Sequence, residues 1–320
     1  MSQNAKGALL ALLAFAVYAT GDVAVKVLGG VYSPIQVIFF SGLFSFPLAM
    51  FMIMRDPQPG TLLPAHPWWT VFRTLATLIT GFSAFYAFSV LPLAQTYTIL
   101  FASPLLITVL AIPLLGEKVR LRRGLAVLVG LAGVLVVLRP GQADLSLGHI
   151  AALVAAFGGS FASVIVRKIG ADERPIVLML YPMAANFVVM GALLPLVYLP
   201  MPIEHIGLLA LLATFGTAGG LIIIAAYKAG EAVIVAPMQY SQILWATFYG
   251  YLFFEESMNW NTSVGAGIII ASGLYIVLRE SGGTASRNTP VLRTRSRPET
   301  GTNMRISPFL KIRLGRKTTE

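Results

Sequence analysis

Asp22 is the residue whose type and position most strongly suggest chemistry in this chain. It lies inside the apolar run 8–28, where a carboxylate is costly unless it faces a cavity or a partner. Such a group could bind a solute or carry a coupling proton. The alternative is an ion pair with Lys26, four residues later on the same helical face. The matching residue in the second half of the chain is Val164, and this difference favours a functional role for Asp22.

A group of polar and aromatic residues accompanies Asp22 on other apolar runs. Aromatic walls with a few polar groups suit a planar or amphipathic organic solute. In membrane proteins, however, tyrosines also anchor the ends of spans, and Ser, Thr and Gln also bond one helix to another. The group as a whole is therefore stronger evidence for a binding site than any single member. The candidate binding or coupling residues are Asp22, Tyr86, Gln95, Tyr97, Asn186, Gln239, Tyr240, Gln242 and Trp245.

Prolines interrupt two of the runs that carry these residues. Pro104 follows Gln95 and Tyr97, and Pro237 precedes Tyr240 and Gln242. A proline in a membrane helix frees a carbonyl that a neighbour or a wet cavity must satisfy. We therefore expect these two helices to open at their prolines, toward a binding site.

Other kinds of chemistry have little support in the sequence. It contains no Gly-x4-Gly-Lys-Ser/Thr phosphate loop, no cysteine and no Gly-x-Ser-x-Gly elbow, and His66, His149 and His205 are scattered without metal-ligand spacing. We expect no enzyme, no catalytic residue, no metal and no cofactor. An enzyme acting on lipids would need acid or His/Asp clusters at the membrane surface. A receptor-like protein whose tail recruits partners is the remaining alternative.

The elements that must position these residues are membrane helices. The chain of 320 residues is 57% hydrophobic and 11% charged, with a mean hydropathy of +0.79. So few charges could not cover a soluble domain of this size. We expect an all-α integral membrane protein with ten transmembrane helices. Their expected ranges are 8–28, 34–54, 70–90, 94–115, 123–138, 147–166, 176–198, 206–227, 233–254 and 262–279.

The two halves of the chain resemble each other. Ala14-Phe15 and Lys26 return as Ala156-Phe157 and Lys168, and Leu114-Leu115-Gly116-Glu117 is echoed by Leu252-Phe253-Phe254-Glu255. Two copies with an odd number of spans must lie antiparallel, as in many secondary transporters. The sequence therefore predicts two inverted five-helix repeats, at 7–139 and 147–280, followed by a basic, disordered cytoplasmic tail at 281–320.

Charge predicts the orientation and the partners. Lys and Arg gather in alternate loops, which places both termini in the cytoplasm under the positive-inside rule. The tail adds further positive charge, but on a ten-helix protein it predicts contact with the lipid bilayer and no binding of nucleic acid. Glycines on the fifth and tenth helices predict close helix packing, either as a scaffold or in a homodimer. They are Gly124, Gly130, Gly133, Gly265, Gly267 and Gly273.

From about residue 7 to 280, the chain resembles the drug/metabolite transporter superfamily in its ten-helix EamA-type branch. The first half carries the resemblance in Leu91-Pro92-Leu93-Ala94-Gln95, Leu115-Gly116-Glu117 and Val137-Leu138-Arg139-Pro140. The second half carries it in Val235-Ala236-Pro237-Met238-Gln239-Tyr240-Ser241, Trp245, Gly250 and Glu255. Phe254 departs from the family pattern, which often has Gly before the acid.

The resemblance implies a secondary carrier that moves a small organic metabolite by alternating access across a bacterial inner membrane. It implies a central cavity lined mainly by helices 1, 3, 4, 6, 8 and 9. The Tyr-Ser-x-x-x-Trp motif that ends at Trp245 is similar to the motif in a branch of the family that includes riboflavin importers and S-adenosylmethionine carriers. Riboflavin uptake is the leading expectation, with Gln95, Gln239 or Asn186 binding its ribityl hydroxyls. The alternative is an exporter of amino acids or other metabolites or drugs.

Overall fold

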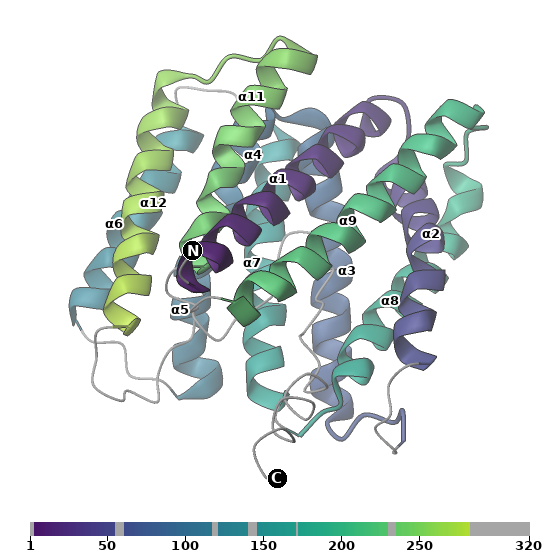
Figure 1. Cartoon of the computed structure of the whole chain (residues 1–320), viewed down its shortest axis with the longest axis horizontal. Coiled ribbons are helices and arrows are strands. Elements are labelled where there is room, and N and C mark those ends of the chain that lie inside the picture. Colours follow the sequence, from purple (N-terminus) through teal and green to yellow (C-terminus); the bar gives the residue numbers. More distant parts are fainter. Residues whose placement is uncertain are drawn as a thin grey trace.

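The protein is a bundle of membrane-length helices (Figure 1). The computed structural model describes residues 3–54, 61–116, 121–139, 146–170, 172–229 and 235–281, and within these ranges every regular element is a helix. Six helices are long and apolar enough to span a membrane, and three further apolar helices are shorter. The predicted all-α membrane fold is confirmed. Beyond Ser281, the predicted tail lies outside the described residues.

The helices correspond to the ten predicted spans, two of which are broken at mid-length. Predicted span 94–115 divides into α4 and α5, and the described part of span 233–254 divides into the 3₁₀ turn η2 and helix α11. The elements are α1 (Gln3–Gly29), α2 (Pro34–Met54), α3 (Pro67–Val90), α4 (Leu93–Leu100), α5 (Ser103–Leu115), α6 (Leu121–Leu138), α7 (Leu147–Ile169), α8 (Pro175–Leu193), η1 (Leu194–Leu196), α9 (Ile203–Ala229), η2 (Ala236–Ser241), α11 (Gln242–Phe254) and α12 (Trp260–Ser281).

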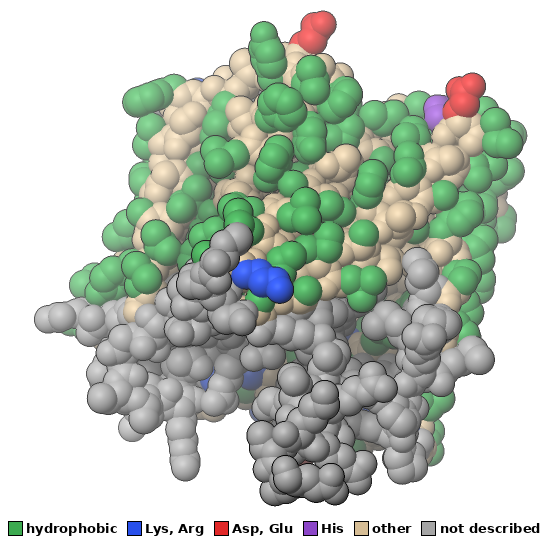
Figure 2. Space-filling view, in the orientation of Figure 1, with side chains coloured by type: hydrophobic (Ala, Val, Ile, Leu, Met, Phe, Trp, Pro, Cys, Tyr) green, Lys and Arg blue, Asp and Glu red, His purple; other side chains and the backbone are tan. Residues whose placement is uncertain are grey.

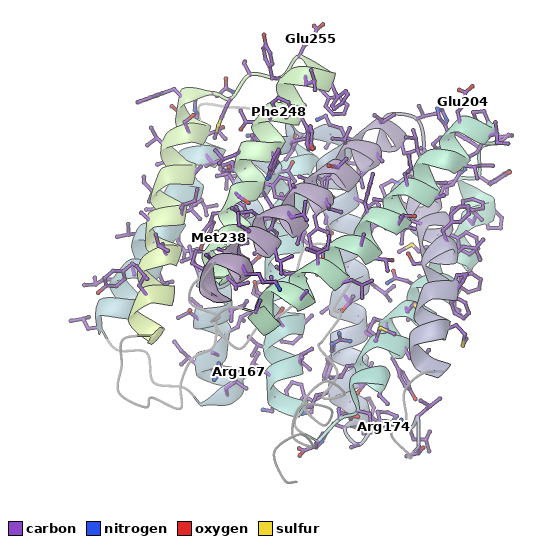
Figure 3. The ribbon with its side chains drawn as sticks, viewed as in Figure 1. Arg167, Arg174, Glu204, Met238, Phe248 and Glu255 are labelled. Carbon is purple, nitrogen blue, oxygen red and sulfur yellow. The ribbon has the colours of Figure 1, made fainter. Side chains whose placement is uncertain are left out.

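The surface separates into an apolar band and two charged ends. Large exposed side chains such as Leu128, Leu244 and Phe248 face outward, and hydrophobic side chains cover much of the face seen in Figure 2. Labelled charges lie at opposite ends (Figure 3): Glu204 and Glu255 at the acidic end, Arg167 and Arg174 at the basic end. An apolar band between charged ends is the surface that a bilayer requires.

Helix packing follows the two halves of the chain. Helix α1 packs most closely on α9, and α3 packs most closely on α7. Because α1 corresponds to α7 in the repeat and α3 to α9, these two contacts are the same contact made twice. Helix α6 packs on α12 and α2 on α8, each joining a helix to its own counterpart. The pattern is the one expected of two repeats that pack on each other reciprocally.

Glycines bring α6 and α12 close together. A Cβ added at Gly133 would lie 2.9 Å from Ile268 and 3.1 Å from the carbonyl oxygen of Gly265. A Cβ added at Gly265 would lie 2.7 Å from the carbonyl oxygen of Gly133. Only glycine permits such an approach of two backbones. These glycines are therefore used within the chain as a scaffold, and the homodimer stays a prediction.

A left-handed residue ends the fourth and the ninth predicted helices. Gly116 has a φ of 68° after α5, and Glu255 has a φ of 53° after α11. The shared backbone conformation aligns Gly116 with Glu255, one residue later than the sequence echo, which matched Gly116 with Phe254. Glu255 thus stands where the first half has Gly116, and it adopts the conformation that glycine adopts most easily.

Candidate functional site

The breaks in two helices create the irregular centre of the bundle. Pro104 cannot donate to the carbonyl of Leu100, and the hydroxyl of Ser103 donates to that carbonyl instead, at 2.7 Å. In the second half, Pro237 lies in the 3₁₀ turn η2, before α11 begins at Gln242. Helix α4 packs against α11. The predicted interruption at both prolines is confirmed, and it ends or begins a helix inside the protein.

Asp22, Tyr97 and Gln242 meet next to these breaks. Tyr97 on α4 donates its hydroxyl hydrogen to Oδ2 of Asp22 on α1. The side-chain amide of Gln242, at the start of α11, donates to the Tyr97 hydroxyl at 3.2 Å. The three side chains are only 3%, 1% and 2% exposed, respectively. A buried carboxylate is thus held by a hydrogen-bond chain that joins three helices.

Aromatic rings surround this chain. The ring of Tyr97 packs edge-on against Phe88, with centroids 5.1 Å apart, and contacts Phe101 at 6.0 Å. Phe101 in turn packs edge-on against Tyr240 at 5.1 Å. Each of these side chains is buried. Carboxylate and aromatic rings together favour a positively charged group, because both attract cations.

A second aromatic pair lies along α11 on the side of α1. The Tyr249 hydroxyl is 2.9 Å from the hydroxyl of Thr20, so it reaches α1 two residues before Asp22. Trp245 stacks on Tyr249, with centroids 6.2 Å apart and planes inclined by 27°. Both aromatic side chains are half-buried. Their faces would suit a flat heteroaromatic ring.

The other predicted site residues lie on α3, α4, α8 and η2. Gln95 contacts His149 at the start of α7, with 2.9 Å between the side-chain nitrogens. Gln239 is half-buried in η2, and Tyr86 is half-buried on α3. Asn186 lies on α8, which packs mainly against α2 and α3. Asn186 and Gln95 therefore belong to different parts of the bundle.

Two buried charged contacts were not predicted from the sequence. Lys26 forms an ion pair with Glu256, 2.5 Å from Nζ to Oε1, and Glu256 was not among the predicted residues. Arg73 on α3 is only 1% exposed, and its Nη1 donates to the carbonyl of Leu178 on α8. Pro182 leaves that carbonyl without its helical donor. A charge inside the apolar run 70–90 was the signal available for Arg73.

Metal chemistry has no visible site in the described ranges. They hold no group of three or more His, Asp or Glu side chains that could hold a metal ion. The described histidine side chains contact other residues: His205 contacts Tyr32 at 2.7 Å, His66 contacts Asp172 at 3.3 Å, and His149 contacts Gln95 and Ser146.

Known proteins resemble this chain over most of its length. An S-adenosylmethionine uptake transporter of Rickettsia bellii (strain RML369-C) is 26% identical over 269 residues, which cover 84% of this chain and 92% of the transporter. The pseudopaline exporter CntI of Pseudomonas aeruginosa (strain UCBPP-PA14) is 24% identical over 277 residues, covering 85% and 93%.

A solved crystal structure supports the fold alone. It matches with a TM-score of 0.53 at 18% sequence identity, over 84% of this chain and 96% of that one. The model of the EamA-like transporter family matches residues 5–139 and again residues 146–278. These two matches cover nearly all of the described helices, so the chain belongs to the EamA-like transporter family, within the drug/metabolite transporter superfamily.

Proposed function

We propose that the protein is a secondary carrier for a cationic, heteroaromatic metabolite of the S-adenosylmethionine class, and that Asp22 binds the cationic group. The observation that carries the proposal is the buried carboxylate of Asp22, which accepts a hydrogen bond from Tyr97 among aromatic rings, while Gln242 donates to the Tyr97 hydroxyl. A sulfonium or ammonium group would replace water beside that carboxylate. The relatives named as S-adenosylmethionine uptake transporters support the same class of solute.

Riboflavin, the solute expected from the sequence, fits this centre less well. It carries no positive charge to compensate Asp22. The residues expected to bind its hydroxyls are also spread out, since Asn186 lies on α8 and Gln95 contacts His149. Riboflavin therefore becomes the comparison solute in the test.

The orientation of the carrier follows from its charged ends. We place the basic end, with Arg167 and Arg174, in the cytoplasm of a bacterium, and both termini with it. The membrane is then the inner membrane. Transport would use an ion gradient or exchange, because the sequence has no phosphate loop for ATP. Export is the second candidate, because one relative is named as an exporter.

The test is uptake and efflux of radiolabelled S-adenosylmethionine in proteoliposomes, with Asp22→Asn at matched protein density. Competition by unlabelled S-adenosylhomocysteine provides the matched control, because it retains the adenosine ring but lacks the sulfonium charge. We expect saturable transport that Asp22→Asn abolishes, and at least about tenfold weaker competition by the analogue that lacks the sulfonium. Equal competition would show that the sulfonium charge is not what the site recognises. Saturable riboflavin transport with no S-adenosylmethionine transport would restore the first expectation.

A further inference from the structure

The acidic end of the bundle is held together by one ion pair that joins three helix ends. Lys26 lies in the last turn of α1, and Glu256 is the second residue after the end of α11 at Phe254. Their side chains are 11% and 18% exposed, respectively. An ion pair this sheltered from water is screened far less than one on an open surface.

Each member of the pair also binds the turn between α3 and α4. Lys26 Nζ donates to the carbonyl of Leu91 at 2.6 Å, and Glu256 Oε2 accepts from the amide of Leu93 at 3.0 Å. Leu93 is the first residue of α4, so the carboxylate also lies at a helix N-terminus. Lys26 further lies 5.2 Å from the ring centre of Phe254. The pair therefore connects α1, the α3–α4 turn and the end of α11.

The backbone around the pair is arranged to bring it together. Glu255 adopts the left-handed conformation, and the amide of Glu256 donates to the carbonyl of Gly250 at 2.9 Å. On the other side, Gly29 allows α1 to approach α3. A Cβ added at Gly29 would lie 2.2 Å from the Cβ of Ser89. The closure at the acidic end thus has a charged part and a close-packed part.

At the basic end, the described counterparts of these helices and of Lys26 are arranged differently. Helix α1 packs against α3, but their counterparts in the repeat, α7 and α9, hardly touch. Lys168 corresponds to Lys26, yet it is exposed and lies 4.5 Å from the ring centre of Trp69. It donates to the carbonyl of Leu114 at 2.8 Å. Among the described residues, Lys26 is thus sheltered in an ion pair, whereas its counterpart Lys168 is exposed.

We propose that Lys26 and Glu256 form the latch that closes the acidic end of the carrier, and that this pair separates each time the carrier opens there. The proposal rests on the proposed transport function. Asp22 lies one turn before Lys26 on the same helix, so a movement of α1 that breaks the latch also moves Asp22 relative to Tyr97. The latch would thereby couple the opening of the acidic end to the contact between Asp22 and Tyr97.

The chain contains no cysteine, which allows a clean test with a single reporter. Ser89→Cys places a thiol at the contact with Gly29, where Ser89 is half-buried. A membrane-impermeant thiol reagent is added separately to intact cells and to inverted vesicles, so the acidic end is reached whichever side it faces. The measured quantity is the labelling rate, which requires no knowledge of the solute.

We expect slow labelling of Ser89→Cys alone and about tenfold faster labelling when Lys26→Met or Glu256→Gln is added, a change that corresponds to about 1.4 kcal/mol. Glu255→Gln is the matched control, because Glu255 is the exposed neighbouring carboxylate and should leave the rate unchanged.

A second route avoids the charged pair. Gly29→Val should also speed labelling, because the added side chain prevents the approach to Ser89, whereas Gly30→Val should not, since a Cβ at Gly30 meets its nearest neighbour at 3.5 Å. Unchanged labelling in folded Lys26→Met and Glu256→Gln, or in Gly29→Val if those misfold, would overturn the latch. If labelling responds as expected but S-adenosylmethionine is not transported, the proposed solute fails and the latch stands.

Discussion

Tyr97 on α4 donates a hydrogen bond to the carboxylate of Asp22 on α1, across 75 residues of sequence and inside the protein. The bond gives a costly intramembrane charge a partner from another helix. Gln242 extends the contact to α11 at 3.2 Å. The hydrogen-bond chain from Asp22 therefore connects α1, α4 and α11. Helix α4 ends at one break, and α11 begins at the other.

Asp22→Asn should reduce transport strongly without lowering the amount of protein in the membrane. The amide keeps the size of the side chain and can still accept from Tyr97, but it loses the negative charge that would attract a cation. Initial transport rates and membrane abundance, measured together across a pH range, provide the check. Unchanged transport at every pH would make Asp22 a structural residue.

Tyr97→Phe should weaken the apparent affinity for the solute by about 10- to 100-fold. The substitution removes a hydrogen bond to a charged group, which contributes about 1.5–3 kcal/mol. Tyr86→Phe is the matched comparison, since Tyr86 is half-buried on α3 and should show the smaller effect. Equal losses in the two variants, measured from concentration dependence, would contradict a specific role for the Tyr97 hydroxyl.

Trp245→Ala should weaken solute binding by about 1–3 kcal/mol if its ring stacks on a heteroaromatic solute. Trp68→Ala is the control, because Trp68 is 75% exposed on α3. Binding to purified protein by calorimetry separates the two. A change within experimental error for Trp245→Ala would assign that ring to packing against Tyr249 alone.

Arg73 and Pro182 should be energetically coupled. Arg73→Met leaves the carbonyl of Leu178 without a donor, but in a Pro182→Ala background the new backbone amide can satisfy it. We therefore expect Arg73→Met to cost about 1 kcal/mol less with Pro182→Ala than without it. Thermal unfolding of the four proteins in one detergent measures this coupling. Strictly additive effects would show that the contact with Leu178 contributes little.

Gly133→Ala should destabilise the bundle by about 1–3 kcal/mol, because the added methyl group meets Ile268 at 2.9 Å within the α6–α12 contact. Gly267→Ala should be neutral or stabilising by up to about 1 kcal/mol, since its position is open and alanine favours the helix. The thermal unfolding midpoints of Gly133→Ala and Gly267→Ala test both expectations. A milder effect at Gly133 than at Gly267 would contradict the observed packing.

The sequence by itself determined the membrane fold and its helices. Long apolar runs must become helices in lipid, because no water is present to satisfy the backbone. Pro104 and Pro237 marked the breaks, because proline lacks the amide that a continuous helix needs. Asp22 was noticeable for its charge within an apolar run. Each of these conclusions depends on local chemistry, which neighbouring residues specify.

Only the tertiary structure decided which side chains meet. Helical periodicity offered Lys26 as the alternative partner of Asp22, and the structure adds the pairing of Lys26 with Glu256 and the bond from Tyr97 to Asp22. It also places Asn186 on α8, which packs mainly against α2 and α3, and it shows that Arg73 donates a hydrogen bond to the carbonyl of Leu178. A period of 3.6 residues defines the face of a helix and leaves open which helix packs on it. That choice depends on the packing of all the helices together, so it cannot be read from any one segment.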